Sequence, residues 1–143
     1  MKKTIIPLVL LIAGITCPAP AQTGSPLKLS GRITDVKHDT LVIYVTDIAA
    51  RTNTYQAVVA LDPEGNFSAD VPATEVSTLT VMEKLDAAER SLIPIARNFS
   101  LPLVPGEQAT VEGTLDTLTL FGSKFYQDYA PVFAIEQQNA KEL

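Results

Sequence analysis

Few residues of this chain have side chains suited to covalent chemistry. There is one cysteine, Cys17, and one histidine, His38. Thiol–disulfide exchange requires a reactive thiolate and a partner sulfur, and a Ser-His-Asp triad requires a histidine within reach of the nucleophile. Cys17 lies in the N-terminal stretch GITCPAPAQ, and His38 lies in VKHDT, which we expect to form an exposed turn. We therefore predict no catalytic residue and expect the protein not to be an enzyme.

A bound metal or cofactor is not expected either. Metal centres use three or four converging ligands, and His38 has only Asp39 beside it. Residues 62–73 begin with alternating acidic and amide side chains, like a calcium loop. Their sixth and twelfth positions are Phe67 and Ala73, where an EF-hand has glycine and glutamate. The sequence also has no glycine-rich phosphate loop. We assign no metal-binding or cofactor-binding residue.

Residues 1–21 have the three parts of a bacterial signal peptide. Two lysines form a positive head, residues 5–15 are almost entirely apolar, and small residues of an A-x-A cleavage site end at Ala21. The apolar run is about half of the roughly 20 residues that a membrane-spanning helix needs. The pattern predicts cleavage after Ala21 and a secreted, periplasmic protein.

The alternative for this segment is a lipoprotein signal. Cys17 would then be acylated and would anchor the protein to a membrane. The residue before it is Thr16, whereas a lipobox has glycine, alanine or serine there. Membrane association is expected only under this alternative. Under both interpretations the mature protein keeps no free thiol.

The charge of the chain excludes one class of partner. The formal net charge is −5, and the cationic residues form no basic stripe along the sequence. Nucleic-acid binding depends on clustered lysine and arginine at the phosphates. We therefore expect no nucleic-acid partner.

The stretch 27–122 has the pattern of a β protein. After a flexible lead at residues 22–26, short runs alternate apolar and polar side chains and are separated by turn residues. This period of two at regular short spacing is typical of an antiparallel sandwich or barrel. We predict a mainly β, antiparallel β-sandwich domain. The turns DPEGN, residues 62–66, and PGE, residues 105–107, predict two hairpins.

The pattern changes to helical spacing over residues 123–143. Ser123 is a candidate N-cap, and Pro131 is expected to kink or interrupt the helix. No stop signal follows, so we expect the helix to lead into a further segment. Four aromatic side chains of this segment form a candidate docking surface, with burial against the sandwich as the alternative. They are Phe125, Tyr126, Tyr129 and Phe133.

Two threonines are candidate modification sites. The tripeptide DTL occurs at residues 39–41 and 116–118. It resembles a short Asp-Thr-apolar acceptor for O-glycosylation of exported bacterial proteins, which would place a glycan on Thr40 or Thr117. The alternative is a plain turn that leads into a strand.

Four segments together resemble a known domain. They are LSGRI at 29–33, the D-x-x-G-x-F turn at 62–67, LPLVPGEQATVEG at 101–113 and LTLFGSKFYQDY at 118–129. The chain resembles an immunoglobulin-like domain of unknown function that lies N-terminal to thioredoxin-like thiol–disulfide oxidoreductases of the TlpA/ResA type in gram-negative bacteria. The resemblance implies an immunoglobulin-like sandwich followed by a helix. It transfers no catalytic residue, because no Cys-x-x-Cys is present.

These observations lead to two functional expectations. The first is a non-enzymatic, exported accessory or interaction module in the periplasm, with an unidentified protein partner. The alternative is an N-terminal fragment of a thiol–disulfide oxidoreductase whose thioredoxin domain is missing from this chain.

Overall fold

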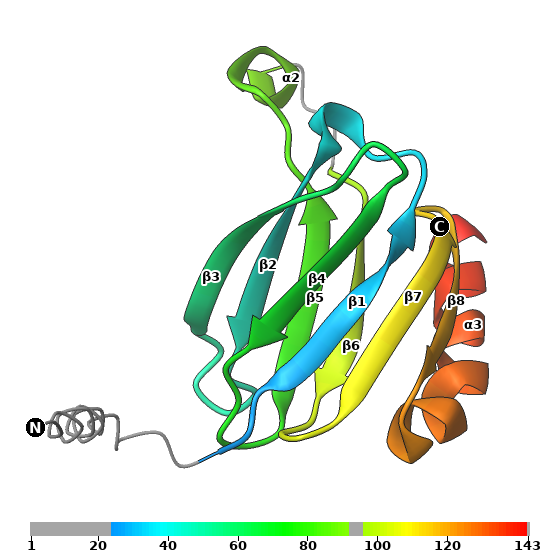
Figure 1. Cartoon of the computed structure of the whole chain (residues 1–143). Helices are drawn as coiled ribbons and strands as arrows, with labels where there is room; N and C mark the ends of the chain where they lie inside the picture. Colours follow the sequence, from blue (N-terminus) through cyan, green and yellow to red (C-terminus); the bar gives the residue numbers. More distant parts are fainter. Residues whose placement is uncertain (1–23, 92–95, 143) are drawn as a thin grey trace, which may run out of the picture.

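Two four-stranded sheets and a long C-terminal helix make up the computed structural model of the chain (Figure 1). It describes residues 24–91 and 96–142. The predicted signal peptide, its cleavage after Ala21 and the alternative lipid anchor at Cys17 lie outside the described residues.

The strands divide between the sheets in an order that does not follow the sequence. The first sheet has the order β4-β1-β7-β8, with β4 at Asn66–Val71, β1 at Leu27–Ile33, β7 at Gln108–Thr114 and β8 at Thr117–Gly122. The second has the order β3-β2-β5-β6, with β3 at Asn53–Ala60, β2 at Thr40–Thr46, β5 at Ser77–Glu83 and β6 at Asn98–Leu103. Among the described residues the helices are the short 3₁₀ helix η1 (Lys37–Asp39), α2 (Ala87–Ser91) and α3 (Lys124–Glu142).

Both sheets bury one face in a common hydrophobic core. Leu29 and Val111 from the first sheet belong to the same buried cluster as Ile43, Val81 and Leu101 from the second. Because successive side chains of a strand point to opposite faces, alternate positions suffice to build this core. The structure confirms a mainly β, sandwich-like fold followed by a helix.

The prediction of a purely antiparallel sandwich is wrong at one strand pair. Strand β1 pairs antiparallel with β4 on one side and parallel with β7 on the other, where Lys28 lies opposite Gln108 and Ile33 opposite Gly113. A parallel pair needs a long crossover. The chain between β1 and β7 supplies one, because it forms β4 and the whole second sheet.

Both predicted hairpins are also wrong, although both turns form. In the DPEGN turn, Asp62 accepts hydrogen bonds from the backbone N–H groups of Glu64 and Asn66, and Gly65 has a φ of 89°. This turn joins β3 of the second sheet to β4 of the first, and the PGE turn joins β6 to β7, again across the two sheets. Alternation determines which face a strand buries. It does not determine the neighbour with which the strand pairs.

Helix α3 closes one open side of the sandwich, where β8 and β6 are the edge strands (Figure 1). It continues without interruption through Pro131, so the expected break does not occur. Tyr126 and Phe133, which lie before and after the proline, are both buried in the core. This packing holds the helix on both sides of the position where proline removes a backbone hydrogen bond.

Candidate functional site

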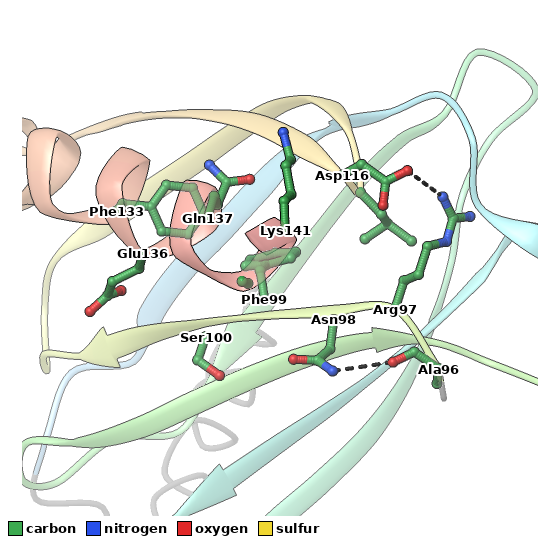
Figure 2. Close-up of a pocket in the computed structure, with 12 residues that line it drawn as sticks. Ala96, Arg97, Asn98, Phe99, Ser100, Asp116, Phe133, Glu136, Gln137 and Lys141 are labelled. Atoms are coloured by element: carbon green, nitrogen blue, oxygen red, sulfur yellow. Dashed lines mark hydrogen bonds and ion pairs between the residues drawn. The ribbon is translucent and has the colours of Figure 1, made fainter. Parts of the chain in front are cut away.

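An open groove lies between the first half of β6 and the C-terminal half of α3. Its volume is about 450 Å³, within the roughly 300–1,000 Å³ that is typical of ligand sites. We call it the β6–α3 groove (Figure 2). Its lining residues are Ala96, Arg97, Asn98, Phe99, Ser100, Leu115, Asp116, Phe133, Glu136, Gln137, Ala140 and Lys141.

The floor of the groove is apolar. Phe99 from β6 and Phe133 from α3 meet edge to face, with ring centroids 6.1 Å apart and an interplanar angle of 81°. Leu115, which follows β7, also lines the groove. Aromatic pairs in this geometry add to the stability gained from burial. The floor is therefore a fixed part of the core.

The backbone of β6 alternates between its neighbour β5 and the groove. The N–H of Glu83 donates to the C=O of Arg97 at 3.1 Å, so Arg97 and every second residue after it point their backbone groups toward β5. The residues between them, Asn98 and Ser100, point theirs away from β5. Among the described residues no strand pairs with this side of β6. We call the outward backbone groups of Asn98 and Ser100 the open edge.

Further along the same side of β6, a tyrosine takes the place of a neighbouring strand. The hydroxyl of Tyr126 donates to the C=O of Pro102 at 2.5 Å and accepts from the N–H of Val104 at 3.3 Å. Burial raises the pKa of Tyr126 to about 12, so the hydroxyl keeps its proton at neutral pH. Tyr126 thus occupies the backbone groups of Pro102 and Val104, which come directly after the open edge along the chain.

The edge of the other sheet is occupied in the same way. The side-chain amide of Gln137 donates to the C=O of Leu118 at 2.7 Å and accepts from its N–H at 2.8 Å. Gln127 donates to the C=O of Gly122 at 2.9 Å. Helix α3 therefore satisfies backbone groups of both edge strands and leaves the open edge of β6 uncovered.

One end of the groove has an ion-pair network centred on Arg97. The guanidinium donates to Asp35 at 2.6 Å, to Glu83 at 3.0 Å and 3.1 Å, and to Asp116 at 3.3 Å. Burial by itself would raise the pKa of Glu83, but the hydrogen bonds and charge of Arg97 outweigh it and lower that pKa. Hydrogen bonding to Glu83 raises the pKa of Arg97. One guanidinium thus joins three carboxylates, and the network carries an excess of negative charge at this end of the groove.

Two other charged residues of the groove are not paired in this way. Lys141 donates to the hydroxyl of Thr117 at 2.7 Å, and Glu136 accepts from the hydroxyl of Tyr129. No residue of opposite charge among those described forms an ion pair with either. Glu136 and Lys141 can therefore meet charges brought by a ligand.

The four aromatic residues expected to form a docking surface do not lie together at the surface. Tyr126 and Phe133 are buried, with exposed fractions of 0% and 2%. Phe125 remains 37% exposed and stacks on the half-buried Tyr129, with ring centroids 6.2 Å apart. Helical spacing places Tyr126 and Phe133 on the face of α3 that covers the core.

His38 lies in an exposed turn, as expected. The acidic residues near its ring are Asp86 and Glu89, whereas the sequence indicated only Asp39. Its Nε2 atom lies 2.8 Å from Glu89 and 4.0 Å from Asp86, and these three could in principle offer ligands to a cation. Glu89 is already engaged: it accepts from the N–H of Asp86 and pairs with Lys37 at 3.3 Å. Asp86 and Glu89 form a capping box at the start of α2. The cluster therefore fits a link between η1 and α2 better than a metal centre.

The candidate modification sites lie at strand starts. Thr40 is half-buried at the start of β2 and donates to the C=O of His38 at 2.8 Å. Thr117 is exposed at the start of β8. The hydroxyl of Thr117 is thus the more accessible of the two.

Of the residues that form the groove, the sequence interpretation singled out Phe133 as a docking residue and missed the rest. One available signal was Pro102: proline lacks an N–H donor, so within a sheet it marks an edge strand. Glu136 and Lys141 gave no signal, because their place opposite β6 depends on how α3 packs.

The chain matches no family model, and a search of curated proteins finds no similar sequence. Within the described residues, none of the helices has the length and apolar character needed to cross a membrane.

Proposed function

We propose that this chain is a non-enzymatic, exported accessory module of the periplasm that binds a protein partner through the β6–α3 groove. The observation that carries the proposal is a stretch of edge strand that no other described strand pairs with, beside an apolar floor. Uncovered strand edges are ready templates for pairing with another chain, and extended peptides commonly bind by adding a strand to such an edge.

An alternative is that the chain is the N-terminal, non-catalytic part of a thiol–disulfide oxidoreductase. Its support is the resemblance to the immunoglobulin-like domain that precedes thioredoxin-like domains. The order of elements, two sheets and then α3, agrees with that resemblance. The partner would then be a domain of the same polypeptide or its substrate.

The intact mass of the endogenous protein separates the two proposals. The protein would be captured from its native host with an antibody to residues 27–120. A mass matching residues 22–143 supports a separate accessory module. A species larger by a whole domain supports the oxidoreductase.

A crosslinking experiment tests the binding function itself. A photo-crosslinking residue would be placed at Ser100 in the groove and, as a matched control, at the exposed Glu112 of β7 in the other sheet. We expect a discrete adduct from Ser100 in the native host and none from Glu112. If positions over the whole surface, including the exposed Val58 of β3, give no adduct, the binding function is wrong.

A further inference from the structure

We propose that the open edge of β6 binds an extended peptide segment as an added antiparallel strand, with the residue order basic, any, apolar, any, acidic. This inference rests on the proposed binding function and specifies the chemistry of the partner. It follows from three properties of the groove: its backbone groups, its floor and its unpaired charges.

The backbone defines where the strand pairs. Asn98 and Ser100 direct their N–H and C=O groups away from β5, in the alternation fixed by the Glu83–Arg97 hydrogen bond. At the next outward position, Pro102 has no N–H, and its C=O is bonded to Tyr126. The added strand therefore pairs with Asn98 and Ser100 and ends before Pro102.

The floor defines the central side chain. In an antiparallel pair, residues directly opposite each other project to the same face. Phe99 projects inward and contacts Phe133, so the peptide residue opposite Phe99 also projects toward the floor. An apolar residue is favoured there, because it is removed from water. The residues on either side of it project outward, beside Asn98 and Ser100.

The unpaired charges define the direction. Glu136 lies near Ser100 and Pro102, with which it shares a second surface pocket, whereas Lys141 lies at the end of the groove that includes Asp116 (Figure 2). A strand antiparallel to β6 first passes Glu136 and then Lys141. A basic residue two positions before the apolar residue therefore meets Glu136, and an acidic residue two positions after it meets Lys141, on one face of the strand.

A second copy of the chain is disfavoured as the occupant. The formal net charge of −5 makes two copies repel each other. It does not oppose a short peptide whose own charges cancel.

The direct test uses an end-blocked peptide, Lys-Thr-Val-Thr-Glu, and the isotope-labelled full chain. Titration followed by NMR is expected to shift the amide signals of Asn98 and Ser100 in a saturable manner. The control edge is β3, where the amide signal of Gln56 should not move. The same peptide with N-methyl groups on both threonines should lose binding about tenfold or more, because these residues donate to β6.

A matched pair of variants isolates the outward N–H of β6. Ser100→Pro removes this N–H at a position equivalent to the natural Pro102, and Ser100→Ala keeps it. Both variants lose the hydrogen bond between the hydroxyls of Ser100 and Thr80. We expect the alanine variant to bind as the wild type does, and the proline variant to bind about tenfold more weakly.

Charge exchange tests the direction. The double variant Glu136→Lys with Lys141→Glu should prefer Glu-Thr-Val-Thr-Lys, whereas the wild type prefers Lys-Thr-Val-Thr-Glu. The far-ultraviolet circular dichroism of the variant checks that it is folded. Equal binding of both peptides to both proteins would overturn the assigned order of charges.

Three results would overturn the inference as a whole. They are no shift at Asn98 and Ser100 with either peptide, equal binding by the alanine and proline variants, and self-association of the chain through β6 in place of peptide binding. If crosslinks in the native host form at Val58 and not at Ser100, the protein has a binding function, but the β6–α3 groove is not its site and the inference about β6 is wrong. If no position crosslinks, the function fails regardless of the peptide result.

Discussion

Gln137 of α3 forms hydrogen bonds with both backbone groups of Leu118 in β8. Its amide nitrogen donates to the C=O at 2.7 Å, and its amide oxygen accepts from the N–H at 2.8 Å. A neighbouring strand would satisfy the same two groups. One glutamine side chain therefore ends the first sheet at β8.

Replacing Gln137 should destabilise the protein. Gln137→Leu removes both hydrogen bonds and leaves the backbone groups of Leu118 without these partners, at a cost of about 1–3 kcal/mol. Urea unfolding of the variant measures the loss. Gln138→Leu, at the exposed neighbouring position, is the matched control and should change the free energy of unfolding by less than about 0.5 kcal/mol. Equal losses would show that the amide has no special role.

The hydroxyl of Tyr126 should contribute a comparable amount. Tyr126→Phe keeps the ring in the core but removes the partner of Pro102 and Val104, and we expect a loss of about 1–2 kcal/mol. Tyr129→Phe removes a hydroxyl that bonds only the exposed Glu136, and its loss should be smaller. Thermal unfolding of both variants checks the order. A larger loss from Tyr129→Phe would contradict it.

Replacement by alanine should lower the free energy of unfolding by different amounts at the two ends of the aromatic segment, Phe125 and Phe133. Phe133→Ala empties a buried position against Phe99 and should cost about 3–5 kcal/mol. Phe125→Ala, at a partly exposed position, should cost about 1 kcal/mol or less. Denaturant unfolding distinguishes them. Similar small losses would mean that α3 is not part of the core.

Arg97 should stabilise the protein in a manner that depends on pH. The pKa of Glu83 lies below its ordinary value of 4.5 in the folded state. A lowered folded-state pKa stabilises the protein above the unfolded-state pKa, and this contribution is lost as pH falls through the folded-state value. Arg97→Met leaves the carboxylate of Glu83 buried without its partner, at a cost of about 3 kcal/mol at pH 7.

The pH profile separates this ion pair from a simple packing effect. At acidic pH the difference in unfolding free energy between wild type and Arg97→Met should shrink, because Glu83 without Arg97 takes up a proton in the folded variant at a higher pH than in the folded wild type, and the penalty for a buried, unpaired carboxylate then disappears. Unfolding curves at pH 3.5, 5 and 7 measure this. A difference that does not change with pH would indicate that Arg97 acts through packing alone.

The sequence predicted the buried faces of the strands better than their neighbours. Alternating residues such as Leu101 and Leu103 are buried, as expected from a period of two. The same alternation is compatible with a hairpin or with a turn that crosses to the other sheet. At residues 62–66 and 105–107 the turn crosses to the other sheet, because both sheets bury their inner faces in one core.

Of two local signals at the helices, one was not used in the sequence interpretation and the other was overridden. Asp86 and Glu89 have the spacing of a capping box, which identifies α2. Pro131 predicted a kink or an interruption, and packing of its neighbours keeps the helix uninterrupted. The charges of the groove depend on tertiary packing, so their spacing in sequence did not reveal them.

The parallel pairing of β1 with β7 has a consequence for the order in which the protein folds. Lys28 of β1 lies opposite Gln108 of β7. Strand β1 therefore cannot pair with both of its neighbours, β4 and β7, until most of the chain is present. Pairings between residues so distant in sequence slow folding to the millisecond-to-second range. During that interval the unpaired side of β1 is exposed. Slow folding of this sheet thus lengthens the time during which an unpaired strand edge is open to association with other chains.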